Sequence, residues 1–285
     1  MSVQVIRIAM LNTDVPVPNV CSKLGSYGDI FHNLLSAAAC RISAGVHIES
    51  TNFDVVAGEY PSIQDHDVLL ITGSASSAYD DIEWIRRLDD YILDVYTHNP
   101  RVRIFGSCFG HQLVCQSLLR THCVRVEKDP NGWELGVQEI QLTENFWKRL
   151  GSPPEGTTSP LDRKLRLQFV HADHVILPTP GLLPESWMTM GSTQHCAVQG
   201  VYQPGRVLTF QGHFEFDRFV NTETLRVFGA AWEPEKLKDA LMAIDADDDS
   251  KLAAEIVVRF LTEKGEGRGD VPRGAGGLLT PPLEE

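Results

Sequence analysis

Short apolar runs alternate with longer amphipathic segments along the first part of the chain. The strand-like runs lie at 3–11, 46–55, 67–73 and 101–105. The helix-like segments, with apolar residues at three- and four-residue spacing, lie at 29–40, 81–99 and 110–120. This alternation predicts β-α units that feed a parallel sheet covered by helices on both faces.

From Thr121 onward the pattern changes to closely spaced strand-like stretches, which are typical of antiparallel hairpins. Residues 151–164 are rich in Pro, Gly and Ser, which predicts a surface loop. Helices are predicted again at 220–232, 235–244 and 251–264. Residues 265–285 are rich in Gly, Pro and charge, so we expect one domain over 1–264 and a disordered tail over 265–285.

Composition narrows the possible partners and the compartment. The 285 residues carry 38 acidic and 25 basic side chains, a formal net charge of −13, which argues against nucleic acid or a membrane surface as partner. No apolar stretch approaches the roughly 20 residues that cross a bilayer. Six cysteines are few for this length and do not suggest a disulfide framework, so we expect a cytoplasmic protein.

Cys108 lies between Gly106 and Gly110, where a predicted strand runs directly into a predicted helix. This is the strand-turn-helix setting of a nucleophile elbow, in which the central side chain is held in a strained conformation. The N–H groups of a helix N-terminus favour a thiolate there. The N–H of Phe109 then points to where an oxyanion would form, so the pattern favours a cysteine nucleophile.

Two other interpretations of Cys108 stay open. It is compatible with a small apolar residue that fills the end of a strand. Cys108, His111 and Cys115 also follow one another at three- and four-residue spacing and could share a helix face as metal ligands. Structural zinc needs a fourth ligand, and none with suitable spacing follows, so we rank catalysis first and expect no metal.

A thiol nucleophile needs a base, and His213 with Glu215 is the best candidate. In an extended segment residues two apart project to the same side, so the Glu215 carboxylate can orient the His213 ring. Phe214 and Phe216 would then point the other way, into the core. A His-x-Glu pair alone is more often a solvated surface pair, and its value here comes from the elbow upstream.

A loop upstream of Cys108 and a strand end downstream of it contribute further candidate site residues. Gly73 and Ser74 follow a buried strand, and a glycine there lets the backbone approach the reaction centre and donate a second oxyanion N–H. The same residues also fit a simple β-α turn with a helix cap. His171 and Asp173 follow another predicted strand and are candidates to line the same cleft.

These residues resemble the class I glutamine amidotransferase family. The family's elbow reads G-x-C-x-G-x-Q, matched by Gly106, Cys108, Gly110 and Gln112, and its base reads H-P-E, matched at His213 and Glu215. The resemblance runs from about residue 4 to about residue 230 and is greatest to stand-alone members such as the γ-glutamyl peptidases. It implies a flavodoxin-like, doubly wound mixed sheet flanked by helices, with an antiparallel β-rich portion in the second half.

The resemblance also implies roles for individual residues. Cys108, His213 and Glu215 would be a catalytic triad that forms a γ-glutamyl thioester, with Gly73 and Phe109 as oxyanion donors. The implied substrate-binding residues are Ser74, Gln112, His171 and Asp173. Two positions depart from the family pattern: Phe214 replaces the usual proline and affects how the His213 loop is set, and Ser107 replaces a common aliphatic residue and adds polarity beside the sulfur.

We therefore expect a cysteine-dependent hydrolase or transferase that cleaves a γ-glutamyl amide in glutamine, glutathione or a glutathione adduct, without a cofactor. The expected partner is this small-molecule substrate, and a separate synthetase subunit is possible because the sequence shows no phosphate-binding P-loop. The alternatives are a glutaminase subunit that supplies ammonia to such a synthetase, and an inactive binding or regulatory module of the same fold.

Overall fold

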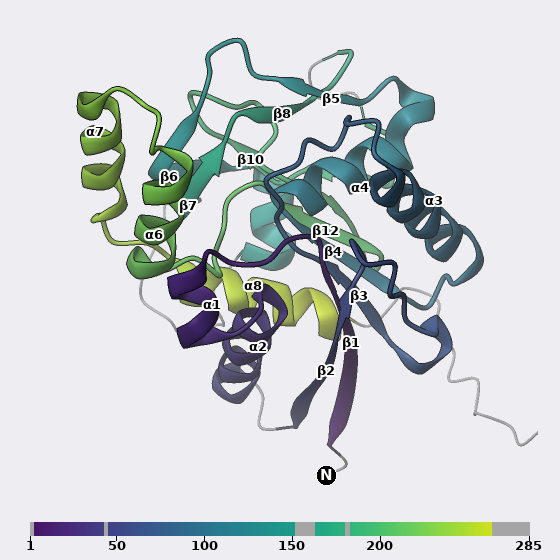
Figure 1. Cartoon of the computed structure of the whole chain (residues 1–285). Coiled ribbons are helices and arrows are strands. Elements are labelled where there is room, and N and C mark those ends of the chain that lie inside the picture. Colours follow the sequence, from purple (N-terminus) through teal and green to yellow (C-terminus); the bar gives the residue numbers. More distant parts are fainter. Residues whose placement is uncertain (1–2, 43–44, 152–162, 180–182, 264–285) are drawn as a thin grey trace, which may run out of the picture.

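The computed structural model describes residues 3–42, 45–151, 163–179 and 183–263 (Figure 1). Nearly all of the surface loop predicted at 151–164 lies outside the described residues. The tail predicted at 265–285 lies wholly outside them.

A seven-stranded mixed sheet forms the centre of the structure, with the order β2-β1-β3-β4-β12-β11-β9. The first five strands are parallel, and the last two are antiparallel additions at one edge. Taken in chain order, the parallel strands have the 2-1-3-4-5 arrangement of flavodoxin-like folds, which confirms the predicted fold class. The strands are β1 (Gln4–Asn12), β2 (Val46–Asp54), β3 (Val68–Ile71), β4 (Arg103–Ser107), β9 (Met188–Thr189), β11 (Val201–Gln203) and β12 (Val207–Phe210).

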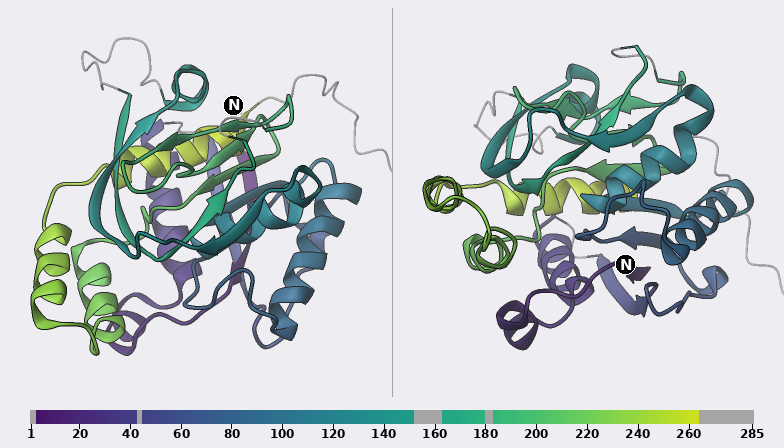
Figure 2. Two further views of the ribbon diagram at one scale, coloured as in Figure 1. Left: turned by 90° about the horizontal axis from the view of Figure 1, so that it is seen from above. Right: turned by 45° about the horizontal axis from the view of Figure 1, so that its top comes forward.

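The central strands β3, β4 and β12 are buried on both faces of the sheet, as continuous apolar runs predict. In β1, Ile8 and Met10 point into one apolar cluster, while Ala9 and Leu11 point into another. The first cluster is covered by α2 and α8, which pack on each other, and the second by α3 and α4 (Figures 1 and 2). These helices are α2 (Tyr27–Ile42), α3 (Glu83–His98), α4 (Phe109–Leu119) and α8 (Ser250–Thr262).

Antiparallel strands in the second half form two further sheets, as predicted. One has the order β10-β6-β7 and the other pairs β5 with β8. Gln168 in β7 forms an isolated antiparallel bridge with His213, whose N–H donates to the Gln168 carbonyl at 2.8 Å. This sheet therefore holds the backbone of the predicted base. The strands are β5 (Arg125–Lys128), β6 (Glu134–Leu142), β7 (Lys164–His171), β8 (Asp173–Ile176) and β10 (Gly191–Ser192).

Three helices gather at one end of the molecule, where α6 contacts α1 and α7, and α7 also packs against β6 (Figure 1). They are α1 (Pro18–Leu24), α6 (Arg218–Phe228) and α7 (Pro234–Ile244). The remaining short elements are α5 (Glu144–Phe146), η1 (Ile63–Asp65), η2 (Arg120–His122) and the π-helical turn η3 (Trp147–Gly151). Within the described ranges, no helix has both the length and the apolar character to cross a membrane.

The carboxyl ends of the parallel strands bring the predicted site residues to one edge of the sheet. Gly73 follows β3, Cys108 follows β4 and His213 follows β12. These strands are neighbours in the order β3-β4-β12. In open α/β sheets this carboxyl edge is where ligands bind, so the topology brings together residues that are far apart in the sequence.

Candidate active site

Cys108 occupies a sharp turn between β4 and α4. Its backbone has φ 51° and ψ −105°, a region that favours glycine, so the turn holds the strain expected of a nucleophile elbow. The flanking glycines permit close packing: a Cβ on Gly106 would lie 2.5 Å from the Gly110 carbonyl oxygen, and one on Gly110 would overlap the Ile71 carbonyl oxygen. Both glycines of the motif are therefore required by the packing of α4 on the sheet.

His213 and Glu215 form a buried pair beside this turn. His213 Nδ1 donates to Glu215 Oε1 at 2.7 Å, and both side chains are almost fully buried. Phe214 points into the core, as predicted. The prediction for Phe216 was wrong in part: its ring is buried, but it stacks on the His213 ring with centroids 4.0 Å apart, so it fixes the plane of the imidazole.

The environment of His213 favours its protonated form. Burial lowers the pKa of His213, but the nearby charges of Glu215 and the Cys108 sulfur, together with the bond to Glu215, raise that pKa to about 10. These interactions favour the protonated ring at neutral pH, and the Cys108 side chain contributes to them both as a charge and as a hydrogen-bonding neighbour. The Nε2 atom of the ring is buried.

Gly73 lies against both Cys108 and His213. A Cβ at this position would be 3.1 Å from His213 Cε1 and 3.6 Å from Cys108 Cβ. All three residues line one small cavity, together with Phe216 and Phe228. The structure thus brings the predicted nucleophile, the predicted base and one predicted oxyanion residue together, and a side chain at position 73 would crowd the space between them.

The two departures from the family motif have clear structural settings. Ser107 does not point at the sulfur: its hydroxyl donates to Glu215 Oε1 at 3.0 Å, so its polarity serves the carboxylate. Phe214 packs edge-on against the rings of Phe31, Phe105 and Phe210. This aromatic cluster anchors the segment that carries the base, in place of a proline.

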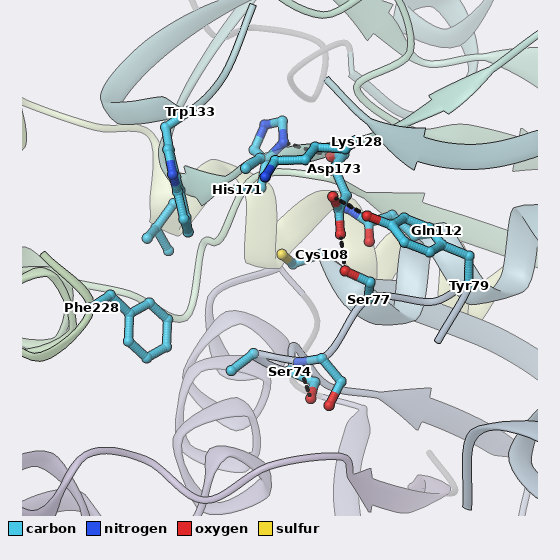
Figure 3. Close-up of a pocket in the computed structure, with 14 residues that line it drawn as sticks. Ser74, Ser77, Tyr79, Cys108, Gln112, Lys128, Trp133, His171, Asp173 and Phe228 are labelled. Carbon is cyan, nitrogen blue, oxygen red and sulfur yellow. Dashed lines mark hydrogen bonds between the residues drawn. The ribbon is translucent and has the colours of Figure 1, made fainter. Parts of the chain in front are cut away.

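A larger cavity of about 390 Å³ opens over Cys108 (Figure 3). All four of the predicted substrate-binding residues line it together with Cys108, namely Ser74, Gln112, His171 and Asp173. Four further residues line the cavity and were not predicted from the sequence, namely Tyr79, Lys128, Trp133 and Phe228. No short motif surrounds these four residues, so the sequence offers no local signal for them.

One wall of this cavity is a fixed polar network. The Asp173 carboxylate accepts hydrogen bonds from Ser77 Oγ at 2.6 Å and from the Tyr79 hydroxyl at 3.0 Å. Gln112 Nε2 donates to the Asp173 carbonyl at 3.0 Å and to Gln211 Oε1 at 3.1 Å. Gln211 in turn donates to the Cys108 sulfur at 3.6 Å, so the network reaches the elbow itself.

His171 is held by protein groups on both sides of its ring. Nδ1 donates to the Asp173 carbonyl at 2.9 Å, and Nε2 lies 2.8 Å from Glu134 Oε2. Burial raises the pKa of Glu134, but bonds from His171, Thr193 and Gln199 outweigh it and hold that pKa below its usual value. Both ring nitrogens of His171 are therefore occupied, and the residue contributes to the wall through its position.

His111 and Cys115, two of the three residues of the alternative metal site, lie in the core. His111 is fully buried, its Nδ1 lies 2.7 Å from Thr209 Oγ1, and burial lowers its pKa to about 3. Burial also raises the pKa of Cys115. No three His, Cys, Asp or Glu side chains of the described chain are grouped so as to hold a metal ion.

Comparison with known proteins identifies relatives in sequence and in fold. No protein-family model matches the chain. A putative glutamine amidotransferase-like protein of Schizosaccharomyces pombe is 32% identical over 264 residues, covering 90% of this chain and 99% of the relative. Gamma-glutamyl peptidase 2 of Arabidopsis thaliana is 27% identical over 205 residues, covering 68% of this chain and 75% of the peptidase. The crystal structure of a glutamine amidotransferase from Thermotoga maritima superposes with a TM-score of 0.65 at 14% identity, covering 90% of this chain and 99% of that one.

The solved structure shares the fold, which is that of class I glutamine amidotransferases. The relatives in sequence support a hydrolase of the class I glutamine amidotransferase type. Because the Schizosaccharomyces pombe relative exceeds 30% identity over nearly its whole length, the chain belongs to the glutamine amidotransferase-like family.

Proposed function

We propose that the protein is a stand-alone hydrolase of γ-glutamyl amides that works through a thioester on Cys108. The observation that carries the proposal is that the strained Cys108 and His213 line one cavity, while the buried Glu215 holds the His213 ring from behind. A cysteine nucleophile, a base and a group that orients the base are the parts that acyl transfer of this kind needs.

In the first half-reaction, the Cys108 sulfur attacks the γ-carbonyl carbon of the substrate and a C–S bond forms. The carbonyl oxygen becomes an oxyanion, which the N–H groups of Gly73 and Phe109 are proposed to stabilise. His213 gives its Nε2 proton to the amide nitrogen, the C–N bond breaks, and the amine leaves. The raised pKa of His213 suits this role because the ring holds its proton at neutral pH.

In the second half-reaction, His213 is neutral and takes a proton from a water molecule, whose oxygen attacks the thioester carbon. The C–S bond breaks, glutamate leaves, and the sulfur recovers its electron pair beside the protonated His213. Glu215 keeps the imidazole in place and balances its charge in both steps, through the 2.7 Å bond to Nδ1.

The polar wall would receive the amino-acid end of the substrate. The Asp173 carboxylate is a suitable partner for an α-ammonium group, and Gln112, which is bonded to the Asp173 carbonyl, and Ser74 line the same cavity. A stand-alone peptidase is favoured over a subunit that supplies ammonia because relatives named gamma-glutamyl peptidases align with more than half of this chain.

The test is labelling with 6-diazo-5-oxo-L-norleucine, a glutamine analogue that alkylates γ-glutamyl-directed cysteines, followed by peptide mass spectrometry. We expect one adduct, on Cys108, and no labelling of Cys108→Ala. Glutamate release from glutamine and glutathione should be lost in Cys108→Ala and His213→Ala and reduced less in Glu215→Gln, since the carboxylate orients the ring but does not transfer the proton. Glutamate release that persists in Cys108→Ala would refute the proposal.

A further inference from the structure

The cavity at Cys108 has two unlike walls. Gln112, Asp173 and Tyr79 lie on one side of the sulfur, and Trp133 and Phe228 lie on the other (Figure 3). The first wall is hydrogen-bonded and charged, whereas the second is aromatic. A ligand that fills the cavity therefore needs a polar end and an apolar end, with the reacting bond between them.

Part of the aromatic wall also borders the base. Val170 and Phe228 line both the larger cavity and the small cavity that holds Cys108 and His213, as Ser74 and Ala75 also do. The group that leaves with the amide nitrogen must sit where His213 can give that nitrogen a proton. Its path from the sulfur therefore runs past Val170 and Phe228.

The aromatic wall is supported from behind and open in front. The Trp133 ring packs against Trp232 with centroids 5.1 Å apart, which holds it at the rim. Phe228 is the last residue of α6 and keeps 37% of its surface exposed. An exposed phenylalanine at the mouth of a catalytic cavity is apolar surface that a bound group can cover.

We propose that Trp133, Val170 and Phe228 form a leaving-group subsite that takes an apolar amine. The preferred substrates are then γ-glutamyl amides whose amine part carries an alkyl or aromatic group. This inference rests on the proposed function. A cavity of about 390 Å³ is in the size range that holds a small organic ligand, whereas ammonia would leave the aromatic wall uncovered.

The reaction needs no further reactant. The γ-carbonyl to nitrogen bond breaks as the bond to the Cys108 sulfur forms, the amine departs with the His213 proton, and water releases glutamate. The subsite acts before the thioester forms, so its effect should appear in kcat/KM for the amide and not in hydrolysis of the common thioester.

The experiment compares γ-glutamylbenzylamide with γ-glutamylmethylamide. Both amines are primary alkylamines, so the comparison isolates the phenyl group. We expect the native protein to favour the benzylamide in kcat/KM by on the order of tenfold, as burial of an aromatic group predicts. Phe228→Ala should lower kcat/KM for the benzylamide more than for the methylamide and so remove most of this preference, and Phe228→Leu should keep part of it.

Val227→Ala is the matched control. Val227 precedes Phe228 on α6, is 53% exposed, and lies outside the described lining of both cavities, so its truncation should leave the preference intact. A benzylamide that is no better than the methylamide would overturn the proposal. An equal loss on both amides in Phe228→Ala, with the fold intact, would do the same.

Binding to Cys108→Ala separates this inference from the proposed function. Calorimetry on this variant measures the affinity for both amides without turnover. Tighter binding of the benzylamide, lost in Cys108→Ala/Phe228→Ala, supports the subsite even if no amide is cleaved. Cleavage of both amides with equal affinity would sustain the proposed function and refute the subsite.

Discussion

Ser107 precedes the nucleophile in the chain, but its side chain contacts Glu215, the residue that orients the base. Its hydroxyl and His213 Nδ1 both donate to Glu215 Oε1, at 3.0 Å and 2.7 Å, while Glu215 Oε2 is buried and has no hydrogen-bond partner among the described residues. One carboxylate oxygen thus carries both contacts, and Ser107 limits the rotation of the group that orients the imidazole.

Ser107→Ala should therefore reduce kcat through Glu215. We expect a decrease of roughly threefold to tenfold in kcat at nearly constant KM, because Glu215 keeps its bond to His213 and loses only one of the two bonds that orient it. In the Glu215→Gln background the same substitution should have almost no further effect. A double-mutant cycle on glutamate release measures this, and additive losses would show that Ser107 acts independently of the carboxylate.

The six cysteines should differ sharply in reactivity. Cys40 and Cys123 are exposed, and burial raises the pKa of Cys115 and raises that of Cys196 to about 12. Cys108 opens into the cavity beside a protonated His213, so we expect iodoacetamide at neutral pH to modify it at least about tenfold faster than Cys40 or Cys123. Time-resolved peptide mass spectrometry measures the rates. Equal rates for Cys108 and Cys40 would contradict an activated sulfur.

At the scale of elements, the sequence correctly predicts the strands and turns whose signal lies within one short segment. The central parallel strands β3 and β4 were recognisable because burial on both faces leaves continuous apolar runs, and the elbow because two glycines bracket one turn. Helix α1 was missed because only Val20 is buried among its seven residues, which leaves no amphipathic pattern. Strand β8 was missed because only one of its four residues is buried.

The aromatic wall could not be predicted for a different reason. Trp133 precedes β6 and Phe228 ends α6, and neither residue belongs to a motif or a periodic pattern that marks a site. They meet over Cys108 only because α6, α7 and β6 pack together at one end of the sheet. Contacts of this kind follow from the assembly of distant elements, which local patterns do not record.

The turn after β3 requires a small residue at position 73, because Gly73 lies against His213 and Cys108. In Gly73→Ala the new Cβ would lie 3.1 Å from His213 Cε1, which is tighter than an ordinary van der Waals contact, so the ring must give way by a few tenths of an ångström. We expect kcat to fall by more than about tenfold while the melting temperature changes by only a few degrees, because the backbone there needs no unusual conformation. Unchanged kcat in Gly73→Ala would show that the turn has room for a side chain.

At the scale of the whole molecule, the protonation of His213 affects the stability of the folded protein. His213 is bonded through its backbone to β7, stacked on Phe216 and paired with Glu215, so its charge is built into the packed structure. The pKa of His213 is raised to about 10 in the folded protein, compared with about 6.5 for an unperturbed histidine. The folded state therefore binds this proton more tightly than the unfolded chain does.

The sign of the linkage fixes the direction of the pH dependence. Because the folded pKa is raised, the contribution of His213 to the free energy of unfolding is fully present below about pH 6.5 and is lost as the pH rises through about 10. The difference in unfolding free energy between the native protein and His213→Gln should thus shrink by a few kcal/mol between pH 6 and pH 10.5. Urea denaturation under reducing conditions measures it, and Cys108→Ala should flatten the trend because the sulfur charge helps to raise the pKa. A difference that stays constant over this range would mean that folding does not raise the pKa of His213, and the ring would then be largely neutral above about pH 6.5, so that it could not supply the proton assigned to it.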